Sequence, residues 1–112
     1  MRLIIITLLF PIFSFSQSYD ILFIGNSYTY YNNLPEMLSN IANAFGDSVN
    51  YDQSTPGGTS LYAHSQNQTT LNKINQQSWD YVVLQDQSQR PSLSPTYVAA
   101  SVYPYASQLV TE

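Results

Sequence analysis

Short apolar runs alternate along this chain with longer segments in which apolar residues recur every three or four positions. The runs at 21–24 and 81–84 are continuous, which is typical of strands buried on both faces of a sheet. Residues 49–53 alternate between apolar and polar side chains and predict a weaker strand nearer an edge. This pattern predicts an open α/β sheet of parallel strands, with 21–24 as its central strand.

The segments between these runs predict helices. Apolar residues recur at helical spacing over 34–45, and Gly46 stands just past the end of that stretch. Residues 61–77 are polar, with a thin apolar stripe, and predict one or two short helices. Residues 97–110 predict a further helix, which Pro104 is expected to kink or split because proline lacks the backbone N–H.

Residues 1–18 differ in composition from the rest of the chain. Their apolar run, 3–13, is about half the length that a membrane-spanning helix requires, and small serines follow it. We therefore predict a secretory signal peptide, removed after Ser16 or Ser18 and leaving no stable membrane anchor; a retained anchor or a buried first strand is the alternative. The protein is expected to be secreted or periplasmic, because an exported chain without cysteine fits a bacterial setting.

Composition narrows the classes of function. The chain has 112 residues, of which 9% are charged, so it forms at most one modest domain. Three basic residues against seven acidic ones, with a net charge of -4, leave no basic patch for nucleic acid. No cysteine and one histidine, His64, exclude thiolate and polyhistidine metal sites, so we expect no metal.

Three polar loops follow the three predicted strands. Residues 25–29, Gly-Asn-Ser-Tyr-Thr, place Ser27 where a nucleophile would stand. Residues 56–60 include two glycines, which allow a backbone N–H to approach a bound oxygen. Residues 85–89 carry side-chain amides that can donate to an oxyanion. Each loop alone is also explained as an ordinary turn, but parallel strands bring all three to one edge of the sheet.

Together the three loops resemble the SGNH hydrolase superfamily, the GDSL-type esterases and lipases. Residues 25–29 are similar to its first block with Asn26 in place of the usual Asp, Gly57 or Gly58 to its second-block glycine, and 79–85 to the strand before its third block. The resemblance covers about residues 19–109. It implies a flavodoxin-like three-layer α/β/α fold and a serine esterase without cofactor, acting on small-molecule or carbohydrate esters, often acetyl esters.

The resemblance also assigns roles by matching position. Ser27 would be the nucleophile and one oxyanion N–H donor, and Gly58 would supply a second N–H. The family's third donor, an Asn in a Gly-x-Asn motif, is absent, so Gln85 or Gln87 is expected to replace it.

Other residues are candidates for contact with substrate. Asn26 stands beside the predicted nucleophile, and three tyrosines that follow it could form an aromatic wall or simply pack: Tyr28, Tyr30 and Tyr31. Arg90 is a candidate clamp for an anionic substrate. Asp80 and Asp86 lie at opposite ends of one predicted strand, roughly 20 Å apart, too far for paired acid–base work. Asp86 is expected to be a solvated loop carboxylate, with an electrostatic influence on the site as the alternative.

The base that would activate the serine is missing from the motifs. The family carries an Asp-x-x-His motif near its C-terminus, and this chain has none. His64 stands six residues after Gly58 on a predicted helix leading away from the strand ends, so a capping or surface role is expected. A contact with substrate, or with the residues that touch it, is the alternative. We interpret 19–112 as the N-terminal part of an SGNH hydrolase-like domain, truncated after the third strand and its helix and nearly inactive alone. The alternative is a noncatalytic carbohydrate-binding domain or pseudoenzyme.

Overall fold

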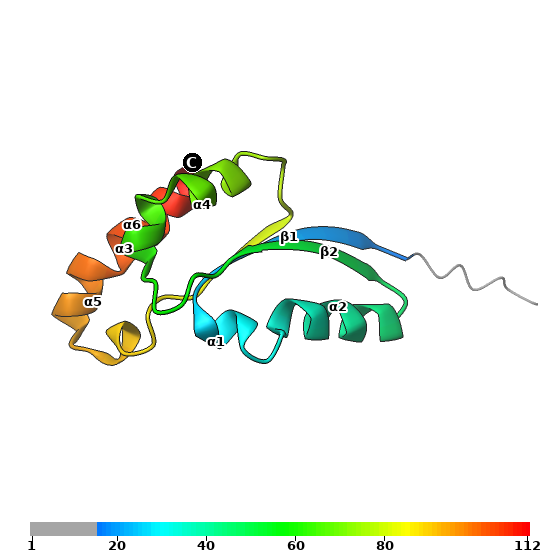
Figure 1. The fold of residues 1–112 in the computed structure, drawn as a ribbon, viewed down its shortest axis with the longest axis horizontal. Helices are drawn as coiled ribbons and strands as arrows, with labels where there is room; N and C mark the ends of the chain where they lie inside the picture. Colours follow the sequence, from blue (N-terminus) through cyan, green and yellow to red (C-terminus); the bar gives the residue numbers. More distant parts are fainter. Residues whose placement is uncertain (1–15) are drawn as a thin grey trace, which may run out of the picture.

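A parallel sheet of three strands forms the centre of the described chain. The computed structural model describes residues 16–112 (Figure 1), and its strand order is β2-β1-β3. The strands are β1 (Ser18–Ile24), β2 (Ser48–Ser54) and β3 (Tyr81–Leu84). The α/β class, the central place of 21–24 and the edge position of the second strand are confirmed. All but the last three residues of the predicted signal peptide lie outside the described residues.

The central strand begins earlier than its apolar run. Ser18 of β1 pairs with Ser48, and the pairing continues in register to Ile24 opposite Ser54. Before the strand, Gln17 donates its N–H to Asp47 Oδ1 (2.9 Å) and accepts from the N–H of Ser48 (2.8 Å). Polar residues ahead of the apolar run are therefore part of the sheet, because their backbone groups pair with β2.

Short helices connect the strands and follow the last one. They are α1 (Ser27–Tyr30), α2 (Leu34–Ala44), α3 (Leu61–Ser65), α4 (Gln68–Ile74), the 3₁₀ turn η1 (Arg90–Ser92), α5 (Pro95–Ser101) and α6 (Tyr103–Thr111). The helix predicted over 34–45 is confirmed as α2, and the polar stretch 61–77 forms two helices. The predicted break near Pro104 is also confirmed, since α5 ends at Ser101 and Pro104 lies in the first turn of α6.

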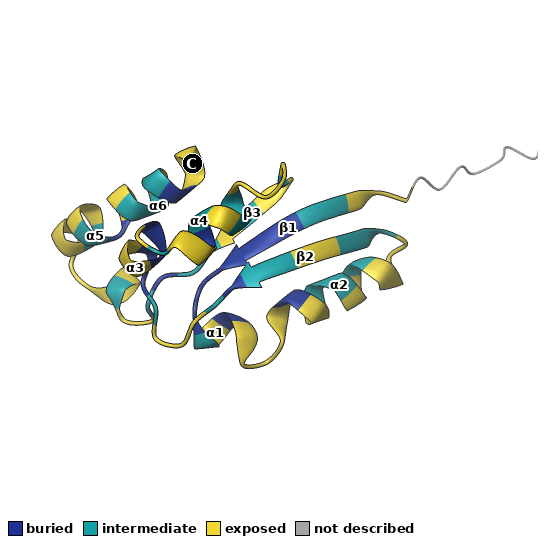
Figure 2. Ribbon diagram, turned by 45° about the horizontal axis from the view of Figure 1, so that its top comes forward, coloured by how far each residue is buried: buried dark blue, intermediate teal, exposed yellow. Residues whose placement is uncertain are grey.

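The main core lies on one face of the sheet, against the helices that follow β2 and β3. Figure 2 shows that burial is concentrated in the carboxyl half of β1. The buried apolar cluster consists of Leu22, Ile24, Leu61, Val102 and Leu109. The thin stripe predicted in 61–77 packs against this cluster, so these short helices are stabilised by burial and not by length.

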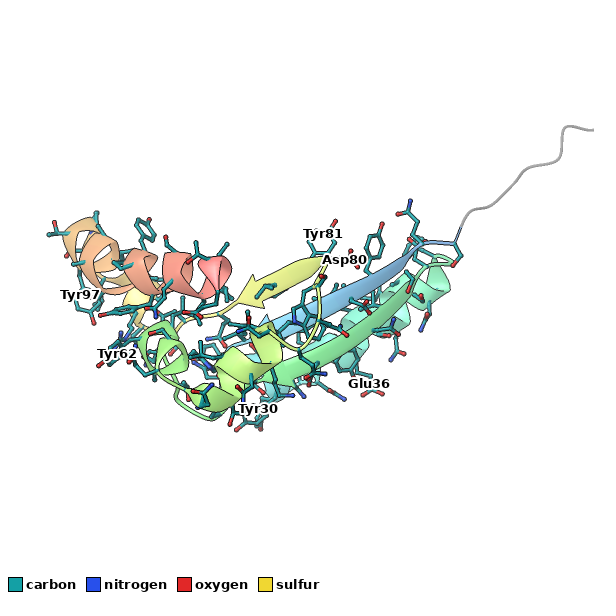
Figure 3. The ribbon with its side chains drawn as sticks, turned by 90° about the horizontal axis from the view of Figure 1, so that it is seen from above. Tyr30, Glu36, Tyr62, Asp80, Tyr81 and Tyr97 are labelled. Atoms are coloured by element: carbon teal, nitrogen blue, oxygen red, sulfur yellow. The ribbon has the colours of Figure 1, made fainter. Side chains whose placement is uncertain are left out.

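The opposite face is less well covered. Among the described helices, α1 and α2 lie on this side, with α2 along β2 (Figure 1). The prediction that 81–84 is a buried strand is wrong, because β3 is an edge strand and its residues alternate: Tyr81 is 57% exposed and Val83 39%. Figure 3 shows Tyr81 at the start of β3.

Helix α2 also leaves apolar side chains in solvent. Its exposed apolar residues recur at helical spacing and include Leu34, Met37 and Ile41, with Phe45 just beyond the helix end. We call these four residues, together with Tyr81 and Val83, the α2–β3 face. No helix within residues 16–112 is both long enough and apolar enough to cross a membrane.

Candidate active site

Ser27 lies at the carboxyl end of the central strand. β1 ends at Ile24, two residues form a sharp turn, and α1 begins at Ser27 (Figure 1). Ser27 is half-buried and lines a pocket of about 460 Å³ together with Tyr28, Tyr31 and Asn32. Ser27 therefore lies at a strand end and beside a pocket, and its role as a nucleophile stays a prediction.

Aromatic rings form much of the surface around this pocket. Tyr28 is 70% exposed and Tyr31 80% exposed, and their spacing of three places them on neighbouring positions of the helix surface. Tyr30 does not line the pocket; its hydroxyl lies near Gly57. Asn32 was not among the predicted site residues, and no sequence signal distinguished it from other loop asparagines.

The turn before Ser27 requires glycine. A Cβ atom at Gly25 would lie 2.4 Å from Thr29 Oγ1 and 2.8 Å from Gln85 Oε1, both closer than real Cβ contacts. The absence of a side chain lets these two polar groups approach the backbone. Gly25 is thus needed here for close approach, since its backbone has no left-handed conformation.

Groups from two other loops hold the backbone of this turn. The Gly25 N–H donates to the carbonyl of Ser54 (3.0 Å), at the end of β2. The Gly25 carbonyl lies 2.7 Å from Nε2 of His64, and the Asn26 N–H donates to Gln85 Oε1 (2.9 Å). The peptide plane between Gly25 and Asn26 is therefore bonded on both sides by side chains that follow β2 and β3.

The side chain of Asn26 joins the first loop to the second. Its Oδ1 accepts from the N–H of Tyr28 (3.1 Å), and its Nδ2 donates to the carbonyl of Thr59 (3.0 Å). Thr59 directly follows Gly58, whose φ of +69° lies in the left-handed region that favours glycine. Within residues 16–112, the N–H groups of Ser27 and Gly58 donate to no protein acceptor.

The third loop contributes two glutamines in different states. Gln85 uses its Oε1 to accept from the Thr29 hydroxyl (3.0 Å) as well as from the turn, and its Nε2 donates to the carbonyl of Asp86. Gln87 accepts from the Gln89 N–H (3.0 Å), while its side-chain NH₂ has no protein acceptor in the described part of the chain. Arg90 lies in η1 and does not line the pocket beside Ser27.

Asp86 is buried, so the expectation of a solvated carboxylate is wrong. It is 7% exposed, and its Oδ1 accepts from the N–H groups of Leu61 (2.9 Å) and Gln87 (2.7 Å). Its Oδ2 is buried and has no hydrogen-bond partner among the described residues. The carboxylate ties the start of α3 to the loop after β3, a long-range contact that no local pattern reveals.

His64 also lies in a different place from the one predicted. The expected capping or surface role is wrong, because the ring is 0% exposed and Nδ1 lies 2.9 Å from Thr70 Oγ1 while Nε2 meets Gly25. The helix α3 is only five residues long and lies against the strand ends, so it does not lead away from them. Burial lowers the pKa of His64, opposed by the Gly25 hydrogen bond and by the charge of Asp86.

These contacts exclude His64 as the base for Ser27. Both ring nitrogens are occupied, and the ring is closed off from solvent. No carboxylate or imidazole of residues 16–112 is hydrogen-bonded to the Ser27 hydroxyl, and no cluster of His, Asp and Glu in that range could hold a metal.

Comparison of the chain with protein-family models, with curated proteins and with solved structures gave no significant match.

Proposed function

We propose that Ser27 is the nucleophile of an exported serine esterase of the SGNH type, and that the described residues supply its nucleophile and oxyanion donors. The observation that carries this proposal is the placement of Ser27 at the end of the central strand and beside a pocket, with the preceding residue, Asn26, bonded to the carbonyl of Thr59, which follows Gly58. A ligand site at the carboxyl ends of parallel strands is the general rule for open α/β sheets.

The chemistry needs donors at the point where negative charge develops. When the Ser27 oxygen attacks an ester carbonyl, the carbonyl oxygen becomes an oxyanion that backbone N–H groups stabilise. The N–H groups of Ser27 and Gly58 donate to no acceptor among residues 16–112 and are therefore available for this role, although Gly58 is exposed and does not line the pocket beside Ser27. Between the two glutamines, the occupied amide of Gln85 favours Gln87 as the third donor.

The pocket favours a carbohydrate ester as substrate. Exposed tyrosine rings offer flat apolar faces with polar tips, which suit the alternating C–H and hydroxyl surfaces of a sugar. Tyr28 and Tyr31 supply such rings beside Ser27, and Asn32 adds an amide that can bond to a hydroxyl group. Arg90 remains a candidate for contact with an anionic group on a larger substrate.

Strong catalysis requires a base that residues 16–112 do not place on Ser27. A serine hydroxyl is a poor nucleophile until a neighbouring base accepts its proton. We propose that an Asp-His pair from an additional segment supplies it, and that this segment packs on the exposed apolar α2–β3 face. With the 112-residue chain alone, turnover should be low.

We also propose that the protein is exported. If a signal peptide is removed, cleavage after Ser16 would preserve the backbone bonds of Gln17 to Asp47 and Ser48, whereas cleavage after Ser18 would remove them. N-terminal sequencing of the secreted protein distinguishes these two positions.

Covalent labelling with a fluorophosphonate tests the assignment of Ser27. The chain should be labelled slowly at one site, and Ser27→Ala should abolish both the labelling and any hydrolysis of an acetyl ester. Ser88→Ala, in the exposed loop after β3, is the matched control and should be labelled like the unaltered protein. Labelling that persists in Ser27→Ala, or none in the unaltered chain under prolonged exposure, would contradict the proposal.

A noncatalytic carbohydrate-binding domain is the second candidate. Among residues 16–112 no base is hydrogen-bonded to Ser27, which favours this candidate, and so do the exposed rings of Tyr28 and Tyr31. In that case neutral oligosaccharides should bind equally well to the unaltered chain and to Ser27→Ala, without any labelling of Ser27.

A further inference from the structure

One chain of buried hydrogen bonds runs behind the serine turn and is not used by the proposed chemistry. It joins Ser54 Oγ to Thr70 Oγ1 (2.8 Å), Thr70 Oγ1 to His64 Nδ1 (2.9 Å), and His64 Nε2 to the carbonyl of Gly25 (2.7 Å). All of its side chains are buried, and His64 and Thr70 are 0% exposed. We call it the Ser54–Thr70–His64 chain.

Simple donor and acceptor rules fix the direction of these bonds. A carbonyl oxygen can only accept, so His64 must carry a proton on Nε2 and donate it to Gly25. In the neutral ring Nδ1 then accepts, so the Thr70 hydroxyl donates to it, and the Ser54 hydroxyl donates to Thr70. The tautomer of His64 is therefore set by the Gly25 carbonyl, and the directions of the two hydroxyl groups follow from it.

The two end residues of the Ser54–Thr70–His64 chain, Ser54 and Gly25, are also bonded to each other directly. Ser54 begins it with its hydroxyl, and the carbonyl of Ser54 also accepts the N–H of Gly25. Gly25 is thus bonded to the end of β2 directly through its N–H and indirectly through its carbonyl. The Gly25 carbonyl and the Asn26 N–H belong to one peptide plane, and on the other side of that plane the Asn26 N–H is bonded to Gln85.

We infer that His64 is a positioning residue, whose neutral Nε2–H tautomer orients the Gly25–Asn26 peptide plane and thereby the direction in which Ser27 projects. The description of Ser27 as the group being positioned rests on the proposed function. The hydrogen-bonded state of His64 does not, because it follows from the buried contacts alone.

Two substitutions at Thr70 test this inference, one with the same shape and one that keeps the hydroxyl group at the loss of a buried methyl group. Thr70→Val removes the hydroxyl that donates to His64 Nδ1, and Thr70→Ser keeps it. In Thr70→Val we expect hydrogen exchange of the Asn26 amide to accelerate about tenfold, since the peptide plane is released locally, and in Thr70→Ser to stay within about twofold of the unaltered protein. Any fluorophosphonate labelling of Ser27 should slow in Thr70→Val and recover in Thr70→Ser.

Leu109→Ala is the control for a loss of stability that does not touch the turn. Leu109 is buried in α6, in the apolar cluster, and takes no part in the hydrogen bonds of the Ser54–Thr70–His64 chain. It should accelerate exchange throughout the core without a selective effect at Asn26. Equal effects of Leu109→Ala and Thr70→Val at Asn26, at matched stability, would overturn the positioning role.

Nitrogen NMR of the unaltered protein provides a readout independent of activity and of mutation. At pH 7 the single histidine should show a neutral ring with the proton on Nε2. A charged ring, or a proton on Nδ1, would overturn the inference. If Ser27 is not labelled in the unaltered chain while this tautomer is observed, the proposed esterase function fails and the orientation of the peptide plane by His64 stands.

Discussion

The carboxyl end of the sheet and the α2–β3 face differ in how well the described residues cover them. At the strand ends, polar groups of the turn are bonded, and even a histidine ring is enclosed with both nitrogens occupied. On the α2–β3 face, side chains that would normally be buried are in solvent: Phe45 is 83% exposed and Ile41 54%. In the first region the turn around Gly25 is bonded by its own loops, while Asp86 Oδ2 nearby is buried without a partner among the described residues. The second region is an apolar surface suited to a further contact.

The described residues bond the polar groups of the turn around Gly25 but leave the apolar α2–β3 face uncovered. Buried polar groups are costly unless they are bonded, so a network as closed as that around Gly25 needs no additional partner for stability. An exposed apolar face costs nothing comparable in solution but favours association. The two regions should therefore respond very differently to substitution.

The largest contrast is expected between two isoleucines. Ile24 is 0% exposed in β1, and Ile24→Ala should lower the free energy of unfolding by about 3 kcal/mol, because a cavity remains in the core. Ile41→Ala, on α2, should change it by less than about 0.5 kcal/mol. Urea denaturation followed by circular dichroism measures both. If Ile41→Ala were as destabilising as Ile24→Ala, the α2–β3 face would be covered in solution.

A smaller contrast separates two glycines. Gly25→Ala should lower the free energy of unfolding by about 2 kcal/mol, since the new Cβ would collide with Thr29 and Gln85 and break their bonds at the turn. Gly46→Ala meets no neighbouring atom, but its φ of +90° strains any L side chain, so a loss of about 1 kcal/mol is expected.

Thermal unfolding and covalent labelling together distinguish these two cases. Gly25→Ala should also suppress labelling of Ser27, whereas Gly46→Ala, at the far end of α2, should leave it unchanged. Suppression of labelling by both variants would mean that the effect follows from stability alone.

The smallest expected effect is a dependence of stability on pH. Burial lowers the pKa of His64 in the folded protein below its ordinary value of 6.5, so the unfolded chain takes up a proton more readily. The stability contributed by the neutral ring is fully present above pH 6.5 and decreases as the pH falls from there toward the lowered pKa. Denaturation midpoints of the unaltered protein between pH 7.5 and pH 5.5 should show this loss.

His64→Gln isolates that dependence from other titrating groups. Glutamine has no proton to gain in this range, so the part of the slope due to His64 should disappear, although the variant is less stable overall. Identical slopes in the two proteins would show that the ring is not kept neutral by folding.

Local pattern was sufficient for most of the fold. Apolar runs predicted β1 and β3, alternation predicted β2, and helical spacing predicted α2, α3 and α4, since these signals depend on neighbours in sequence. The strand 81–84 was predicted to be buried because its residues are apolar, yet it forms an edge. Burial on a second face depends on which element covers it, and that is not encoded in the strand itself.

At the candidate site, residue type and position relative to the strands selected Ser27 and the Gly57–Gly58 loop, because parallel strands bring successive loops to one edge. Three-dimensional contacts were needed to establish that His64 and Asp86 are buried. His64 meets a carbonyl 39 positions earlier in the chain, and Asp86 meets an amide 25 positions earlier. Bonds over such separations arise only when loops from different strands converge, so the order of residues along the chain does not reveal them.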